Sequence, residues 1–253
     1  MIKFENTSVF NLEGAIRGMR NPKNSWHLSD SVRCGDREEC EGCEFLDVCK
    51  NQKKYVSEHD IVTIGENDMK LMKNLIKAGT DHRKFMRQIL VSVDITAPLY
   101  FWKEADTYKV GTVANSCSTM HKIHAKKFTL DDFSHEHLTD DIWDRGLMDS
   151  VIVDEDPKSY SKVFLTPLET LKCTIEQLNI CRANYIETKD KKWWWQMIQL
   201  LPSSYNQKRT VTLNYEVIRN MYHSRKNHKL DEWNEGFVEW VELLPYCNEL
   251  IIE

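Results

Sequence analysis

Hydrophobic and polar side chains alternate most regularly between residues 89 and 96, where aliphatic residues at every second position are separated by Ser92, Asp94 and Thr96. This period of two predicts a half-buried strand. Apolar runs at 1–4 and 59–64 predict two further strands. Residues 10–19 and 69–76 instead show helical spacing, and the second of these helices has Asn67 or Asp68 as its expected N-cap and Gly79 as its stop.

The second half of the chain is mainly helical in pattern. A short helix is predicted after Ala97-Pro98, through residue 105, and longer ones over 168–181, 193–201, 214–223 and 233–244. Pro167 suits the first turn of a helix, and Pro202 and Pro245 end two of the others. Few strands and a helix-rich C-terminal half predict an α+β fold with a small mixed or antiparallel sheet. We expect a single domain over 1–253 with an inserted segment over 30–55.

Composition and charge narrow the class of protein. The 253 residues are 41% hydrophobic and 29% charged, as in soluble globular proteins, and the formal net charge is -5. A negative balance disfavours general affinity for nucleic acid. No apolar run approaches the roughly 20 residues that span a bilayer, and the first residues lack an export pattern. We therefore expect a cytoplasmic protein without a membrane partner.

Four of the eight cysteines fall within sixteen residues, Cys34, Cys40, Cys43 and Cys49, with spacing C-x5-C-x2-C-x5-C. A C-x2-C turn brings two thiolates to one ion, and the outer pair can complete a zinc site or ligate a [4Fe–4S] cluster. The alternative is four free thiols or two disulfides. Surrounding carboxylates favour a structural role for the metal. The other four cysteines are scattered, and most of them are expected to be buried thiols.

Five segments share their order and spacing with a known family: LMKNLIKAG, ILVSVDITAPLYFWKE, VANSCSTMH, MIQLLP and TLNYEVIRNMYHSR. Asn214 lies twelve residues after Pro202, Arg225 lies eleven after Asn214, and His228 follows closely. In this pattern the chain resembles the flavin-dependent thymidylate synthase (ThyX-like) family, as a divergent member. The resemblance covers about two thirds of the chain and leaves out the cysteine-rich insert.

The chain departs from the family pattern at several motif positions. Glu104 stands where the family has Gln, and residues 107–109 replace its Arg-His-Arg. Ser116 replaces a Glu, while Met120 and Ile198 replace arginines. A guanidinium binds phosphate or a pyrimidine edge through two parallel hydrogen bonds, which Met and Ile cannot make.

The resemblance implies one-carbon transfer, methylation or hydroxymethylation, to a pyrimidine deoxynucleotide such as dUMP, with reduced FAD and methylenetetrahydrofolate. It also implies a homotetramer. The implied catalytic residues are Arg225 and Ser118, and the implied substrate-binding residues are Lys103, Glu104, Ser118 and Arg225. The implied cofactor-binding residues are Asn214, Asn115, Lys109 and His228.

Each site residue also has a simpler interpretation. Arg225 could form a salt bridge at a helix end, Asn214 could be an N-cap, and Ser118 could be a turn hydroxyl. A non-catalytic nucleotide-binding or regulatory protein that retains the fold is therefore the second hypothesis. Residues 193–195 are all Trp, and successive helical positions differ by about 100°, so at least one is expected at the surface or in an oligomer interface.

Overall fold

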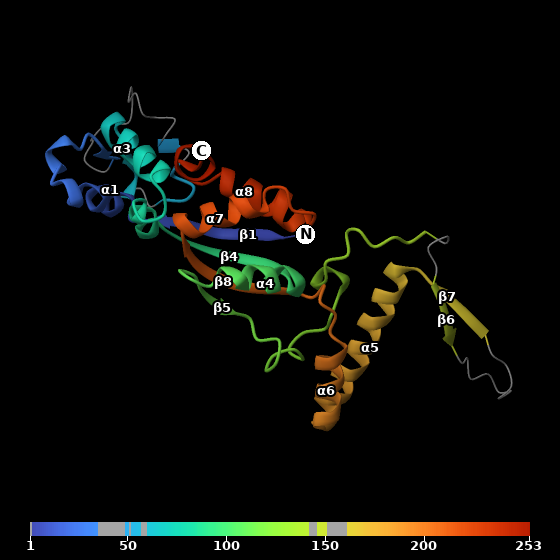
Figure 1. Ribbon diagram of the computed structural model, residues 1–253. Coiled ribbons are helices and arrows are strands. Elements are labelled where there is room, and N and C mark those ends of the chain that lie inside the picture. The colour runs from blue at the N-terminus through green and yellow to red at the C-terminus, as the bar shows by residue number, and fades with distance from the viewer. Residues whose placement is uncertain (1, 35–48, 51, 57–59, 142–145, 151–160) are drawn as a thin grey trace. The chain divides into compact units, whose positions relative to one another are not determined.

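The computed structural model describes residues 2–34, 49–50, 52–56, 60–141, 146–150 and 161–253, the side chains of 146–150 and 161–164 excepted. The chain divides into two compact units (Figure 1). The sheet unit comprises Ile2–Ala97, Phe101–Ser116 and Lys208–Glu253, and the helical unit comprises Pro98–Tyr100 and Cys117–Gln207. The single domain over 1–253 and the insert over 30–55 stay predictions.

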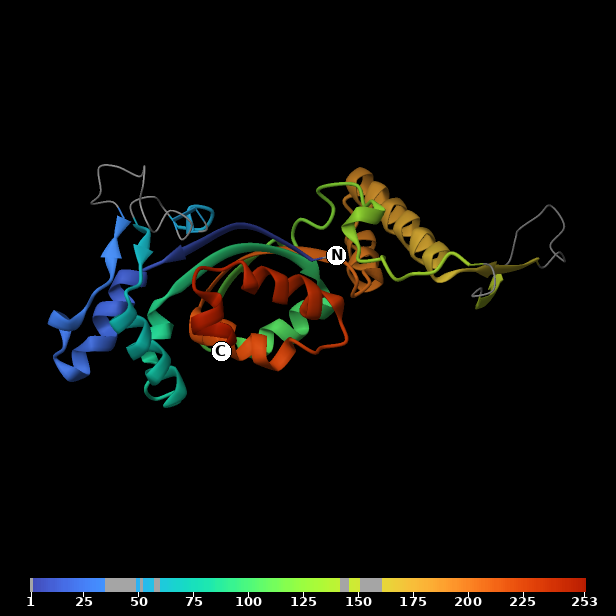
Figure 2. The ribbon, with the colours of Figure 1, turned by 90° about the horizontal axis from the view of Figure 1, so that it is seen from above.

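The main sheet has four strands, in the order β1 (Lys3–Phe10), β4 (Leu90–Pro98), β8 (Asn206–Asn214) and β5 (Val113–Ser116). β1 pairs antiparallel with β4, and β5 pairs antiparallel with β8. Val91, Val93 and Ile95 of β4 are buried, whereas Ser92 and Asp94 are half-buried, which confirms the predicted alternation. Helices α7 (Tyr215–Arg225) and α8 (Val238–Glu242) lie along one face of this sheet (Figure 2).

The rest of the sheet unit is built from short elements. They are α1 (Leu12–Arg20), α3 (Glu66–Lys77), α4 (Leu99–Ala105), the π-helical segments Glu232–Phe237 and Asn248–Ile252, and the ladder of β2 (Val32–Arg33) with β3 (Val62–Thr63). Single 3-10 turns cover Asn21–Lys23, Trp26–Leu28, Lys84–Gln88 and Asp106–Tyr108. The largest fully buried side chains of this unit include Trp233, Tyr215 and Phe101. The core therefore lies between the sheet and the C-terminal helices.

In the helical unit, α5 (Pro167–Thr188) packs against α6 (Lys191–Leu200). The Thr166 hydroxyl accepts from the Glu169 N–H while the Glu169 carboxylate accepts from the Thr166 N–H, a capping box that fixes the start of α5. Leu178 and Met197 are fully buried between the helices, whereas Trp195 is 44% exposed. The prediction that the three tryptophans do not share one core is thus confirmed. β6 (Gly146–Ser150) pairs antiparallel with β7 (Ser161–Leu165).

Several element predictions need correction. β1 runs to Phe10 instead of ending at Phe4, and the strand expected over 59–64 is the two-residue β3, with residues 57–59 outside the described part. β8 was not predicted. The last helix begins as a π-helix at Glu232. Of the scattered cysteines, Cys181 and Cys247 are buried but Cys117 and Cys173 are exposed. No described helix is both long and apolar enough to cross a membrane.

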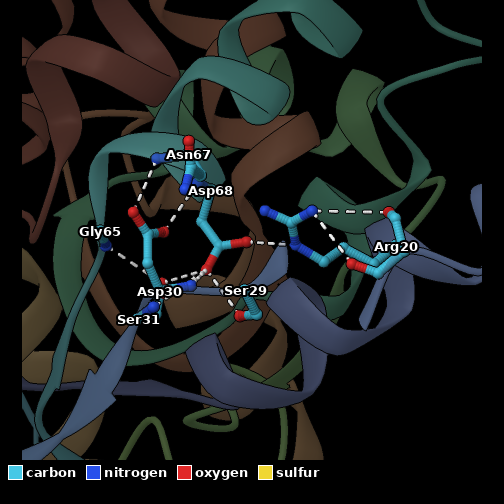
Figure 3. Close-up of polar contacts among 8 residues, drawn as sticks. Arg20, Ser29, Asp30, Ser31, Gly65, Asn67 and Asp68 are labelled. Carbon is cyan, nitrogen blue, oxygen red and sulfur yellow. Dashed lines mark hydrogen bonds and ion pairs between the residues drawn. The ribbon is translucent and has the colours of Figure 1, made fainter. Parts of the chain in front are cut away.

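Asp68 has a different role from the predicted cap. The N-cap residue of α3 is Gly65, and the Asp30 carboxylate accepts hydrogen bonds from the Asn67 and Asp68 N–H groups at 2.9 and 3.1 Å. Asp68 is fully buried and accepts from Arg20 Nε at 2.6 Å, as Figure 3 shows. The sequence pattern that suggested a cap therefore marks a buried ion pair between α1 and α3.

Four further donors converge on the second oxygen of Asp68. Oδ2 accepts from the Ser29 hydroxyl at 2.7 Å, the Ser31 hydroxyl at 2.6 Å and the backbone N–H groups of Asp30 and Ser31 at 3.2 and 3.1 Å. Burial by itself raises the pKa of Asp68, but the bonds from Ser31, Ser29 and Arg20 and the charge of Arg20 bring the pKa below its ordinary value of 3.8. The carboxylate is therefore stabilised in its charged form.

We predict that Asp68→Asn lowers the free energy of unfolding by about 3–5 kcal/mol at pH 7, because it leaves the Arg20 guanidinium buried without a counter-ion. Urea denaturation measures the loss. Since the folded pKa is lowered, the stabilisation is present above pH 3.8 and is lost as the pH falls through the folded value. The difference in stability between the unaltered protein and Asp68→Asn should therefore shrink in acid.

The control, Glu253→Gln, breaks an exposed pair with Lys73 and should cost less than about 1 kcal/mol. Equal losses in both variants would contradict the interpretation.

Candidate functional site

Arg225, the last residue of α7, is the centre of a cluster of polar and aromatic side chains in the sheet unit. Its Nε donates to the Tyr108 hydroxyl at 3.0 Å, and its Nη1 lies 3.0 Å from Glu104 Oε2. The guanidinium carbon lies 5.2 Å from the ring centroid of Trp233 and 5.6 Å from that of Tyr108. With 20% of its side chain exposed, Arg225 is held in one orientation by ionic, hydrogen-bonding and cation–π contacts.

His228 is the second positively polarised group beside Glu104. Its Nδ1 accepts a hydrogen bond from the Leu230 N–H at 3.2 Å, which assigns the ring proton to Nε2. That nitrogen lies 3.3 Å from Glu104 Oε2. Oε2 is buried, and neither contact has hydrogen-bond geometry, so this carboxylate oxygen has charge partners but lacks a directional donor.

Trp233 forms the apolar floor of the cluster. It is fully buried, and its ring lies 4.3 Å from that of Phe101 and 5.3 Å from that of Phe237. The π-helix Glu232–Phe237 carries both Trp233 and Phe237. π-helical turns are rare and occur often at functional sites. The indole Nε1 has no hydrogen-bond partner among the residues described, which makes it a second unsatisfied polar atom beside Arg225.

Asn214 adopts the simpler of its two predicted roles. Its Oδ1 accepts from the Val217 N–H at 3.1 Å and caps α7, while its Nδ2 is 3.5 Å from the Gly111 carbonyl. Asn115 is exposed on β5, directly opposite Thr210 of β8. Asn214 therefore lies at the start of α7 and Arg225 at its end.

The remaining predicted residues do not join this cluster. Lys103 and Lys109 are exposed, on α4 and just after the 3-10 turn Asp106–Tyr108. Ser118 belongs to the helical unit, where its hydroxyl accepts from the His121 N–H at 2.9 Å as a turn residue. Within the sheet unit, the structure thus brings together Glu104, Arg225 and His228 of the predicted set.

Two residues of the cluster were not predicted. Tyr108 is the middle residue of the segment that replaces the family's Arg-His-Arg. The Tyr in place of His was the one feature of the sequence that could have pointed to a role for Tyr108 in the site. Trp233 was predicted to lie on the apolar face of a C-terminal helix, and nothing in its spacing distinguishes it from an ordinary core residue. Its role depends on tertiary contacts with Arg225 and Phe101.

Two of the four clustered cysteines lie in the described part of the chain. The Cys34 and Cys49 sulfur atoms are 3.3 Å apart, although the residues are fifteen positions apart. Cys34 also donates its N–H to the Ile61 carbonyl at 2.8 Å. Cys40 and Cys43 lie outside the described residues. Among the residues that are described, no group of three or more His, Cys, Asp or Glu side chains is arranged to hold a metal ion.

No family model and no curated protein matches this chain. Two solved structures of thymidylate synthase X (ThyX) from Helicobacter pylori, both with FAD and dUMP, are similar in fold. Each has a TM-score of 0.57 and 13% sequence identity, covering 99% of this chain and 96% or 97% of the ThyX chain. The predicted ThyX-like α+β fold is confirmed. At this identity the likeness shows the fold alone.

We predict that Asn214→Ala lowers the free energy of unfolding by about 1 kcal/mol, because the Val217 N–H loses its acceptor. Asn214→Asp should retain most of the stability, since a carboxylate accepts the same bond at a helix N-terminus. Urea denaturation of the ligand-free protein measures both. An equal loss in the two variants would contradict the capping role.

Proposed function

We propose that this chain is a flavin-dependent synthase of the ThyX type that transfers one carbon from methylenetetrahydrofolate to a pyrimidine deoxynucleotide such as dUMP. We further propose that it acts as a homotetramer. The fold-level likeness to ThyX over nearly the whole chain supports the proposal. The exposed Trp195 and Ile180 of the helical unit are the kind of apolar surface that subunit contacts bury.

The observation that carries the proposal is the arrangement of Arg225. Nε and Nη1 are held by Tyr108 and Glu104, and Nη2 has no hydrogen-bond or ion-pair partner among the described residues. A fixed guanidinium with one unused amino group suits a neutral carbonyl better than a phosphate, which would approach the Glu104 carboxylate. Arg225 would therefore bind a pyrimidine carbonyl and draw electron density from the ring.

The Glu104 carboxylate gives the site an acceptor beside that donor. A pyrimidine edge presents a donor and an acceptor side by side, either N3–H next to a carbonyl oxygen or an amino group next to N3. Glu104 and Arg225 complement such an edge. Arg225 Nη1 and His228 Nε2 lie 3.0 and 3.3 Å from Glu104 Oε2 and hold this acceptor beside the donor.

The residues available for a flavin fit that cofactor in their chemistry. Lys109 and Asn115 are exposed and would contact its phosphates and polar ring atoms, and Asn214 Nδ2 makes only a 3.5 Å contact. When bound, a reduced flavin would supply hydride and the folate would supply the carbon. Lys103 and Ser118 are proposed to bind the nucleotide, Lys103 through its charge.

A non-catalytic nucleotide-binding protein is the alternative. Its support is that Arg225 is already paired with Glu104, and that Met120 and Ile198 stand where the family has arginines. With fewer guanidinium groups the protein would bind phosphate more weakly, while Arg225 and Glu104 would still bind the base. Such a protein would bind nucleotide without turnover.

We predict that purified protein takes up FAD, seen as flavin absorption bands, and binds dUMP by calorimetry. Arg225→Ala should weaken dUMP binding at least about tenfold, because a charge-assisted bond to the base is lost. Arg225→Lys should restore little, since a lysine cannot keep both the Tyr108 and Glu104 contacts. The exposed Arg87→Gln is the matched control and should bind as the unaltered chain does.

Turnover decides between the two functions. Release of the C5 proton of dUMP in the presence of reduced flavin and methylenetetrahydrofolate supports the synthase. Binding of dUMP without proton release supports the regulatory protein. A chain that binds neither FAD nor dUMP contradicts both.

We also propose that Cys34, Cys40, Cys43 and Cys49 hold zinc or a [4Fe–4S] cluster as a structural centre. The 3.3 Å separation of the Cys34 and Cys49 sulfur atoms supports it, because that contact brings together the two ends of the C-x5-C-x2-C-x5-C segment. Thiolates are ligands that both centres use.

Metal analysis of freshly purified protein should find one zinc ion or about four irons per chain, the latter with a broad brown absorption. Cys40→Ser combined with Cys43→Ser should remove the metal and lower the melting temperature, because the site stabilises only the folded chain. Cys173→Ser, at an exposed cysteine, is the control. Absence of metal from protein purified without oxygen or chelators would contradict the site.

A further inference from the structure

A cavity of about 340 Å³ lies beside the Arg20–Asp68 pair, lined by residues of α1, of the segment 26–33 and of β3. Its volume falls within the range of small-molecule sites. Of the described residues, Arg17, Arg20 and Arg33 line it, together with the single acidic residue Glu13. None of these residues belongs to the cluster around Arg225. In a chain of net charge -5, three arginines around one cavity mark a place suited to an anion.

The two outer arginines make long, exposed contacts with Glu13. Arg17 Nη1 and Arg33 Nη1 lie 3.9 and 3.8 Å from the Glu13 carboxylate, and Arg33 Nη2 contacts Asp60 at 3.1 Å. The side chains are 69% and 43% exposed, and such exposed pairs contribute little stability. Both guanidinium groups can therefore exchange Glu13 for a ligand with more charge, such as a phosphate dianion.

Arg20 provides the inner wall and an unsatisfied donor. It is 3% exposed, its Nε is bound to Asp68, and its Nη1 donates to the Ser25 carbonyl at 3.2 Å (Figure 3). Its Nη2 has no hydrogen-bond partner in the part of the chain that the structure describes. Four neutral donors besides Arg20 also bind the Asp68 carboxylate, and Nη2 is the donor of Arg20 that the described residues leave unused.

Trp26 gives the cavity an aromatic wall. It is 51% exposed, yet its Nε1 donates to Asn21 Oδ1 at 2.8 Å, which fixes the ring. Ile16 and Val62, both buried, add an apolar surface. An oriented indole ring next to guanidinium groups can stack a planar base while the arginines bind the attached phosphate.

We propose that this cavity binds a nucleoside monophosphate, with the phosphate between Arg17 and Arg33 and the base stacked on Trp26. The ligand chemistry follows from the two halves of the site. Arginines alone would suit inorganic phosphate, and the exposed but fixed indole adds recognition of a ring. The site is separate from the proposed dUMP site and can be occupied together with it.

Calorimetry with AMP as the probe, in the presence of saturating dUMP, tests the proposal. AMP should bind with one site per chain. Ribose 5-phosphate and inorganic phosphate should bind at least about fivefold more weakly, because they lack the stacking ring. Arg17→Gln combined with Arg33→Gln should weaken AMP at least about tenfold, and Trp26→Ala should bring AMP to the level of ribose 5-phosphate. Arg87→Gln, which removes an exposed guanidinium elsewhere, should leave AMP binding unchanged.

Three outcomes would overturn the proposal. They are no AMP binding at millimolar concentration, AMP binding that the arginine variants do not weaken, and inorganic phosphate binding as tightly as AMP. If the chain fails to bind dUMP, the proposed function fails. AMP binding to the unaltered chain, and its loss in the arginine variants, still test the proposed cavity site independently. Circular dichroism of each variant separates lost binding from lost folding, and Arg20 is left intact because its removal would unfold the region.

Discussion

The N-terminal third of the sheet unit depends on one buried carboxylate. Asp68 of α3 accepts from five donors, one from Arg20 of α1 and four from the segment 29–31, so three stretches of chain are fixed relative to one another by a single charge. All of these contacts are needed, because a buried charge is tolerated only when it is paired and hydrogen-bonded. The arginine-lined cavity and β2, which leads to Cys34, both rest on this arrangement.

Local pattern predicted those elements whose burial follows one period. β4 buries Val91, Val93 and Ile95 on one face, and α5 has a proline, a capping box and a regular stripe. β8 escaped prediction because its buried face carries Arg209, which is only 14% exposed and stacks 4.2 Å over Trp102 while paired with Asp106. Arg209 can be buried because residues distant in the sequence pair with it. A charged residue at a buried position breaks the alternation of apolar and polar residues, and a local sequence pattern does not reveal its distant partners.

The candidate site was predictable to a similar extent. Spacing from Pro202 identified Arg225, and motif position identified Glu104, and these two meet in the fold. Asn214 caps α7 at the end opposite Arg225, and its role in the site stays a prediction. Tyr108 and Trp233 were missed because their contacts join segments more than a hundred residues apart. At 13% identity the likeness to ThyX shows the fold and not these side chains.

The geometry of the candidate site depends on the number of residues in the π-helix Glu232–Phe237. A π turn holds one residue more than an α turn, and each residue of a helix rotates the next by about 100°. Removing one of the five residues other than Trp233 would let the segment relax into an α-helix and would swing the Trp233 ring off the Arg225 guanidinium. Side chains here can change by substitution, but the length of this segment cannot change without dismantling the stack that orients Arg225.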